Sequence, residues 1–262
     1  MRTLLVALLL ALGGVSLAAA WPHIPAHWPA HWIASASDRL YRVADDGTLM
    51  REGRARIAER FRAAGSALGA PVFIRIFKEE AELELWAPSP AGPYVRVHTF
   101  PICYYSGPLG PKQREGDGMS PEGFYAVGAK QLLPTSRYHR AFNIAFPNAY
   151  DRAQGRTGSY LMVHGDCVSI GCYAMTDRGI SEIYTAVEDA LGDGQGSVPV
   201  HIFPFRMDEA RMARASGPWL GFWRNLKEGY DAFETTRVPP RVGVRGKRYV
   251  FDDPGARPIR GW

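Results

Sequence analysis

Residues 158–177 read GSYLMVHGDCVSIGCYAMTD and place a cysteine on a short loop between a predicted strand and a predicted helix. The apolar run that ends at His164 predicts the strand, and the Thr-Asp pair that closes the stretch is a typical helix start. The loop between them carries Cys172 directly after Gly171. Because loops on a rigid scaffold often bear reactive groups, Cys172 is a candidate functional residue.

Cys172 and His164 together predict nucleophilic chemistry. A thiolate is the reactive form of cysteine, and a neighbouring imidazole can accept the thiol proton. His164 lies eight residues before Cys172, and a loop of that length can bring the two side chains together. A Cys–His pair is the minimal set for acyl transfer through a thioester. Backbone amides beside Gly171 could then form an oxyanion hole.

The same residues also allow other interpretations. Cys167 and Cys172 could form a disulfide, or either could be an inert core thiol. His164, Cys167 and Cys172 could bind zinc as H-x2-C-x4-C, but a structural zinc site usually takes four ligands and no second pair lies nearby in the sequence. We therefore predict no metal site and no cofactor, while the disulfide and the inert thiol stay open.

The rest of the chain predicts an α+β fold class, with a mainly β core and helices packed on it. Short runs rich in β-branched and aromatic residues predict strands at 72–77, 83–86, 94–98, 124–127, 142–146, 160–164 and 198–203. Helical spacing of apolar residues predicts helices over 36–66, 177–191 and 208–236, the last broken at Gly217-Pro218. A hairpin is expected at 241–251.

The N-terminus is typical of an export signal. Residues 1–20 combine an early arginine, an apolar run and three closing alanines, so we expect a signal peptide cleaved before Trp21. Residues 21–35 are rich in Pro, Trp and His and predict an extended arm. No repeat or linker follows, so 36–262 is predicted to be one domain. We expect an exported, periplasmic protein with no stable membrane span after cleavage.

Composition narrows the class of protein further. The 262 residues are 46% hydrophobic and 22% charged, which is a globular balance and excludes a disordered chain, a collagen and a coiled coil. The formal net charge is +5, but lysine and arginine form no long basic block. A nucleic-acid partner is therefore not expected.

Several blocks of the sequence resemble one known family. HG followed by S-x-G-C is similar to the signature of the L,D-transpeptidase catalytic domain, the YkuD family. The stretch from Ser106-Gly107 through Lys112 and Asp117 to SPEGFY resembles the family's SGP-K…GD…TPEG-x-Y block. The YafK-like branch shares HGDCVSIGCYAMT at 164–176, FPNAYDRA at 146–153 and APVFIRIFK at 70–78. The resemblance covers about residues 36–250 and implies a YkuD-like sandwich or barrel core.

This resemblance implies an exported enzyme that modifies peptidoglycan. Cys172 would attack the amide between an L-centre and a D-centre of the stem peptide, and His164 would take the thiol proton and later protonate the leaving amine. An amine acceptor gives cross-linking and water gives hydrolysis; the YafK-like branch is associated with release of wall-attached lipoprotein. The alternatives are a non-catalytic cell-wall binding module with an inert Cys172, or a hydrolase that uses Asp117 and Glu122 as its acids.

Further site residues are expected around the pair. The oxyanion and substrate-binding candidates are Gly171, Ser169, Gly165, Tyr150 and Tyr173, with Tyr150 in a predicted loop before the catalytic strand. The chain departs from the wider family in its shorter His-to-Cys interval. Ile170 replaces the His of S-H-G-C, and Ala174 stands where many members carry Arg or Asn.

The pairing of the three cysteines has three possible outcomes. If Cys172 is the nucleophile, Cys103 and Cys167 remain for each other, and the resemblance places both beside one cleft. A bond between them would brace the loop that carries Cys172. Cys167 and Cys172 could instead form a regulatory disulfide. The third outcome is that no bond forms. A Cα separation above about 7 Å would exclude a Cys103–Cys167 bond.

Overall fold

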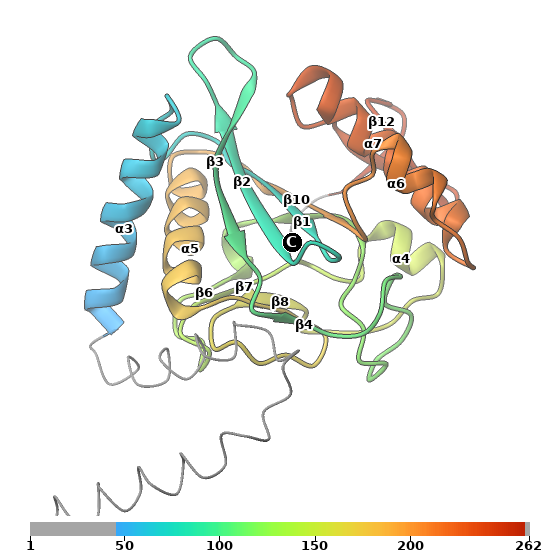
Figure 1. The fold of residues 1–262 in the computed structure, drawn as a ribbon, viewed down its shortest axis with the longest axis horizontal. Helices are drawn as coiled ribbons and strands as arrows, with labels where there is room; N and C mark the ends of the chain where they lie inside the picture. The colour runs from blue at the N-terminus through green and yellow to red at the C-terminus, as the bar shows by residue number, and fades with distance from the viewer. Residues whose placement is uncertain (1–45, 260–262) are drawn as a thin grey trace, which may run out of the picture.

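The computed structural model describes residues 46–259, in which helices flank two five-stranded sheets (Figure 1). The predicted signal peptide, the predicted arm and the first ten residues of the predicted helix over 36–66 lie outside the described residues. The strands are β1 (Phe73–Phe77), β2 (Glu82–Pro88), β3 (Tyr94–Pro101), β4 (Tyr104–Tyr105), β5 (Gly123–Val127), β6 (Leu132–Leu133), β7 (Ala141–Asn143), β8 (Met162–His164), β9 (Tyr173–Ala174), β10 (Val198–Phe203), β11 (Val242–Arg245), β12 (Arg248–Phe251) and β13 (Arg257–Pro258). The helices are α3 (Asp46–Ala63), α4 (Ala149–Ala153), α5 (Asp177–Gly192), α6 (Glu209–Ala213) and α7 (Leu220–Thr236), with a 3-10 turn η2 (Ala129–Gln131).

The larger sheet has the strand order β3-β2-β1-β10-β5. β1 runs parallel to β10, and the other neighbours are antiparallel. Every residue of β1 is buried, because helices cover both faces of the sheet. Alternate residues of a strand point to opposite faces, so Ile74 and Ile76 enter one core while Phe73 and Phe77 point away from it.

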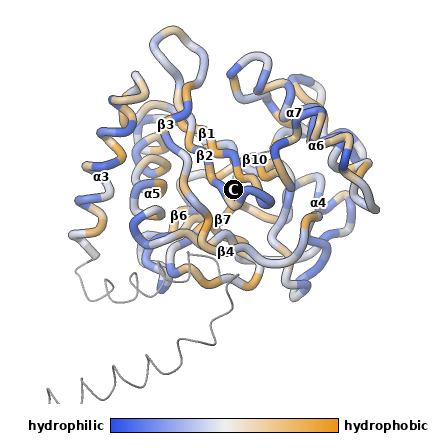
Figure 2. Tube along the Cα trace, viewed as in Figure 1, coloured by the Kyte–Doolittle hydropathy of each residue, from blue (hydrophilic) through white to orange (hydrophobic). Residues whose placement is uncertain are grey.

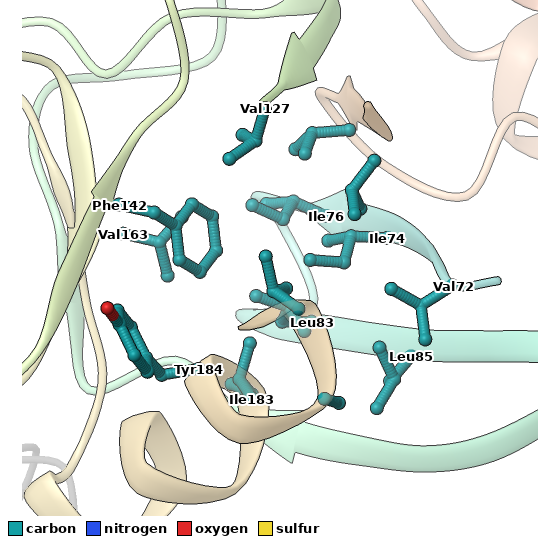
Figure 3. Packing of buried hydrophobic residues seen from close by; sticks show 14 of the residues in the cluster. Val72, Ile74, Ile76, Leu83, Leu85, Val127, Phe142, Val163, Ile183 and Tyr184 are labelled. Carbon is teal, nitrogen blue, oxygen red and sulfur yellow. The ribbon is translucent and has the colours of Figure 1, made fainter. Parts of the chain in front are cut away.

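The first core lies between the larger sheet, the smaller sheet and the pair α3 and α5. In Figure 3, Ile74, Ile76 and Leu83 of the larger sheet face Phe142 and Val163 of the smaller sheet, with Ile183 and Tyr184 of α5 closing the space. Figure 2 shows hydrophobic colour gathered on the central strands and mixed colour along α3. The apolar stripe predicted for 177–191 is confirmed as the buried face of α5.

A second core lies on the opposite face of the larger sheet, beneath α7. Phe77 and Phe203 stack with ring centroids 5.6 Å apart, and Tyr230 of α7 meets both rings edge-on. The hairpin β11–β12, predicted over 241–251, packs its Tyr249 into the same cluster. The C-terminal part of the chain therefore covers the face of the sheet that α3 and α5 leave free.

The smaller sheet has the strand order β4-β9-β8-β7-β6, and its strands are only two or three residues long. Only β8 and β9 are parallel; the other pairs are antiparallel. The α+β class is confirmed. Of the expected sandwich or barrel core, the described residues form two open sheets that face each other across a core, and no closed barrel. Within residues 46–259 no helix is long and apolar enough to cross a membrane.

Two local predictions need correction. The short strand β9 lies between Cys172 and α5, because residues 173–174 pair with both β4 and β8. Residues 147–151 do not form an open loop: Asn148 caps α4 by accepting a hydrogen bond from the Asp151 amide at 2.8 Å.

Candidate active site

The pairing of β8 with β9 places Cys172 and His164 on one face of the smaller sheet. Val163 is opposite Tyr173 and His164 is opposite Ala174 in this parallel pair. Met162 and His164 point to the same face, and the register continued by one residue sets Cys172 opposite Met162. The Met162 amide lies 3.4 Å from Cys172 Sγ, which agrees with that register. Both Cys172 and His164 line one pocket of about 610 Å³.

Cys172 is the free cysteine of the described chain, and its surroundings favour a neutral thiol. Its Sγ donates to the Tyr160 carbonyl at 3.5 Å and accepts from the Met162 amide. Burial raises the pKa of the thiol, and the Met162 amide and the Lys112 charge oppose this only in part. The thiol therefore needs a base to become a nucleophile near neutral pH.

His164 is buried and held in one orientation. Its Nδ1 hydrogen-bonds the Gly165 carbonyl, and the Tyr138 ring packs on it at a centroid distance of 4.7 Å. Because a carbonyl only accepts hydrogen bonds, Nδ1 carries the proton and Nε2 is the basic nitrogen. Burial lowers the pKa of His164, against opposing effects of the Gly165 carbonyl, Asp166 and Asp177, so the ring is neutral at pH 7.

The neutral imidazole and the neutral thiol fit general-base chemistry. No hydrogen bond joins the His164 ring to Cys172 among residues 46–259. Catalytic hydrogen bonds are often long in a free enzyme and tighten when substrate binds. Proton transfer therefore requires a closer approach of the two side chains, or one bridging water.

Two serines from the Ser106–Phe124 block hold the nucleophile loop. Ser106 Oγ accepts a hydrogen bond from the Gly171 amide at 2.8 Å and donates to the Ser169 carbonyl at 3.2 Å. Ser120 Oγ donates to the Cys172 carbonyl at 2.9 Å, and Ser169 Oγ donates to the same carbonyl at 2.8 Å. The hydroxyls thus fix the backbone on both sides of Cys172, a role that the sequence analysis missed.

A disulfide ties the same loop to β4. Cys103 and Cys167 are bonded, with a Cα separation of 5.0 Å, and the regulatory Cys167–Cys172 alternative is therefore wrong for this state of the chain. The bond also removes Cys167 from the possible zinc set with His164. Among residues 46–259 no group of three or more His, Cys, Asp or Glu side chains could hold a metal ion.

The expected oxyanion donors are already occupied in part. The Gly171 amide donates to Ser106, and the Gly165 amide donates to the carbonyls of Tyr138 and Arg140. This makes the Cys172 amide the better candidate for an oxyanion hole. Gly171 has a different importance: its φ of +112° is in a region that side chains rarely adopt, so glycine lets the loop turn just before the nucleophile.

The two tyrosines named by the sequence do not line the pocket of Cys172. Tyr173 is fully buried, and its hydroxyl donates to the Pro121 carbonyl at 2.6 Å. Tyr150 lies in the second core, stacked on Tyr249 at 4.1 Å, because α4 turns it toward α7. The structure therefore does not bring Tyr150 to the pocket of Cys172. Ser169 does line the pocket.

The two acids of the alternative hydrolase are committed to cations. Glu122 is fully buried; it accepts from Lys78 Nζ at 3.0 Å and from the Trp223 indole at 2.9 Å. Asp117 accepts from Lys112 Nζ at 2.6 Å and from backbone amides, and these bonds lower its pKa to about 2, against burial. Neither carboxyl group lines the pocket. Both acids instead hold backbone amides of the same segment, Glu122 that of Gly110 and Asp117 that of Gln113.

A mixed α+β fold with a cysteine and a histidine in one pocket defines a candidate thiol-dependent acyl-transfer protein. The model of the L,D-transpeptidase catalytic domain, YkuD, matches residues 30–202. The chain belongs to this family. It is 56% identical over 188 residues to "Putative L,D-transpeptidase YafK" of Escherichia coli, which covers 71% of this chain and 76% of that protein.

Solved structures give weaker likenesses. A point mutant of the helical cell shape determining protein Pgp2 from Campylobacter jejuni overlaps with a TM-score of 0.43 and 19% identity, over 62% of this chain and 56% of that one. The Bd1075 structure from Bdellovibrio bacteriovorus overlaps with a TM-score of 0.39 and 17% identity, over 73% and 91% of the two chains.

Proposed function

We propose that the chain is an exported peptidoglycan-modifying enzyme, in which Cys172 performs acyl transfer at an L-centre to D-centre amide of the stem peptide. The observation that carries the proposal is that a free thiol and His164 line one pocket, with the His164 tautomer set by the Gly165 carbonyl. Family membership supports peptidoglycan as the substrate.

The first step breaks the amide. His164 Nε2 accepts the thiol proton as Cys172 Sγ bonds to the carbonyl carbon, and the oxyanion is stabilised by the Cys172 amide. The C–N bond then breaks, and the imidazolium returns its proton to the leaving nitrogen, which departs as a neutral amine. The product is a thioester on Cys172. These reaction steps need no metal and no organic cofactor.

The second step decides the reaction class. Water attacking the thioester gives a carboxylic acid and returns the proton through His164 to the sulfur, which makes the protein an amidase. An amine attacking in the same way gives a new amide, which makes it a transpeptidase. The expected substrates are stem peptides, and wall-attached lipoprotein is the candidate leaving group for the hydrolytic reaction.

Export is supported by two independent features. The 1–20 stretch has the pattern of a signal peptide, and a structural disulfide joins Cys103 and Cys167. Disulfides of this kind persist in oxidising compartments such as the periplasm and are rare in the cytosol.

The test uses purified sacculi with and without covalently attached lipoprotein, incubated with the wild-type protein, Cys172→Ala and the exposed control Arg224→Gln. Release of lipoprotein by the wild type and Arg224→Gln identifies the amidase, and new links between stem peptides identify the transpeptidase. Cys172→Ala should give neither. Equal product from folded Cys172→Ala would remove Cys172 from the mechanism.

A second measurement addresses the inert-module alternative. Because Cys103 and Cys167 are bonded, iodoacetamide should label one cysteine per native chain, Cys172. The proposal expects labelling that is lost or strongly slowed in His164→Ala, since the base then no longer assists ionisation of the thiol. Labelling no faster than that of a model thiol, together with no product from sacculi, would establish the binding module.

A further inference from the structure

We propose that Arg137 is a specificity residue that recognises a carboxylate of the substrate beside the scissile amide. The inference rests on the proposed function, because it assigns the chemical class of the group next to Cys172. Arg137 lines the same pocket as Cys172 and His164. Of the lining residues that the structure describes, Arg137 is the one with a permanent charge, and none is Asp or Glu.

Arg137 is linked to the general base through the Tyr138 ring. Its guanidinium lies over that ring, 5.3 Å from the centroid, and the His164 imidazole packs against the same ring at 4.7 Å with a tilt of 32°. The segment is also bound to the residue next to His164, because the Gly165 amide donates to the Tyr138 and Arg140 carbonyls at 3.1 and 3.2 Å.

The backbone next to Arg137 is held in a conformation that side chains rarely adopt. His139 has a φ of +65°, yet it is buried and its Nε2 hydrogen-bonds Ser181 Oγ of α5 at 2.7 Å. A non-glycine residue in this region costs free energy and persists only when its surroundings enforce it. The enforced segment presents Arg137 at the rim of the pocket rather than leaving the side chain to an unrestrained loop.

The guanidinium itself is available to a ligand. Arg137 is exposed, and among residues 46–259 it makes neither an ion pair nor a hydrogen bond. Many arginines of the molecule have the opposite arrangement, for example Arg75, Arg156 and Arg206, which are bound to carboxylates. A planar guanidinium with free donors matches a carboxylate through two parallel hydrogen bonds.

A carboxylate can reach Arg137 from either side of the scissile bond. It can belong to the acyl donor that becomes the thioester, or to the amine that leaves. Either carboxylate makes the same charge-assisted contact with Arg137. The rest of the pocket wall contains no acid that would compete for Arg137, and it offers apolar surface that includes the exposed Ile170 and Tyr160. The pocket therefore selects an anionic substrate over its neutral amide analogue.

The experiment compares three synthetic stem peptides with the same L-centre to D-centre amide. One has all carboxylates free, one is amidated on the acyl side, and one is amidated on the leaving side. Wild type, Arg137→Gln, Arg137→Lys and the exposed control Arg224→Gln are assayed for kcat and KM. Peptide affinity is measured in parallel by calorimetry on the same variants combined with Cys172→Ala.

Arg137→Gln should lower kcat/KM and affinity for the free peptide about ten-fold, mainly through KM, because a charge-assisted hydrogen bond is lost. The loss should vanish for the one peptide whose recognised carboxylate is amidated, which identifies its side. Arg137→Lys should recover part of the affinity, since it keeps the charge without the planar fork. Arg224→Gln should match wild type.

The outcomes separate this inference from the proposed function. Two results overturn the role of Arg137 while the proposed enzymatic function stands. In the first, Arg137→Gln lowers kcat/KM equally for all three peptides; in the second, it lowers kcat/KM for none of them. Carboxylate-dependent binding that requires Arg137, without turnover in any assay, overturns the enzyme and leaves the recognition site. Absence of binding and of turnover for every peptide overturns both.

Discussion

The two five-stranded sheets of the molecule are held together in different ways. The larger sheet has central strands of five to seven residues, buried on both faces by helices and aromatic side chains. The smaller sheet, which carries Cys172 and His164, has strands of two or three residues. Its short ladders are supplemented by serine hydroxyls and a disulfide. Stability and catalysis are therefore expected to respond to different mutations.

The largest effect on activity should come from the base. His164→Ala should lower kcat/KM by about 10²–10⁴-fold, because the thiol then has no general base. His98→Ala, which removes a partly exposed histidine of the larger sheet, is the matched control and should keep full activity. Assays on sacculi with both variants check this. Retention of wild-type activity by His164→Ala would show that His164 is not the general base for Cys172.

A cavity beside the larger sheet should lower stability and leave activity unchanged. Ile76→Ala removes a fully buried side chain from the first core and should lower the free energy of unfolding by about 3 kcal/mol. Activity per folded molecule should be unchanged, since Ile76 points into the core and does not line the pocket of Cys172. Thermal denaturation and an assay corrected for the folded fraction test both halves. Loss of activity without loss of stability would contradict the division between the sheets.

Removal of the disulfide should lower both the stability and the activity of the protein. Cys103→Ser combined with Cys167→Ser should lower the free energy of unfolding by about 2–4 kcal/mol, because the closed loop spans 64 positions. Activity should fall as well, since the Cys167 anchor of the nucleophile loop is lost. Denaturant titration and assay below the unfolding transition separate the two effects. Unchanged activity in the folded double variant would mean that the serine contacts alone hold the loop.

Removal of single serine hydroxyls should have smaller effects, and Ser106 and Ser66 form a matched pair. Ser106→Ala leaves the Gly171 amide without its acceptor, and Ser66→Ala removes a hydroxyl that donates to the Pro88 carbonyl beside the larger sheet. Each should cost about 1 kcal/mol of stability. Only Ser106→Ala should lower kcat, because only that serine positions the Cys172 loop. Equal activity in the two variants would show that the loop keeps its shape without Ser106.

The smallest expected effect is a displaced pH profile. Burial lowers the pKa of His164 below its ordinary 6.5, and a protonated ring cannot accept the thiol proton. Activity should therefore persist as pH falls to 6.5 and decline only below it. A profile of kcat/KM against pH measures the position of this acidic limb. A limb centred above 6.5 would contradict the neutral, buried base.

Long, continuous patterns made the larger sheet predictable. The apolar runs at 72–77 and 198–203 correspond to β1 and β10, and the stripe at 177–191 corresponds to α5. The strands β4, β6 and β9 have two residues each, which is too short for a period to show. Their pairing depends on contacts between distant segments, and no local propensity specifies such contacts.

The site residues that belong to one sequence motif were predictable, whereas the contacts between residues far apart in the sequence were not. The sequence identified Cys172 and His164 as candidates from residue type and spacing. It did not reveal that Ser106 accepts from Gly171, because the two residues are 65 positions apart. Tyr150 was misplaced because its neighbours were interpreted as a loop, whereas Asn148 caps a helix and turns the ring into the second core.

The arrangement of the cysteines has a consequence for how the chain matures. Cys167 has two possible partners during oxidation: Cys172, five positions away, and Cys103, 64 positions away. Closing the shorter loop costs less chain entropy, so an unfolded chain forms the non-native pair more readily. That pair would consume the thiol needed for catalysis, and exchange with Cys103 would be needed to release it. The yield of active protein therefore depends on β4 meeting β9 before oxidation, or on disulfide shuffling afterwards.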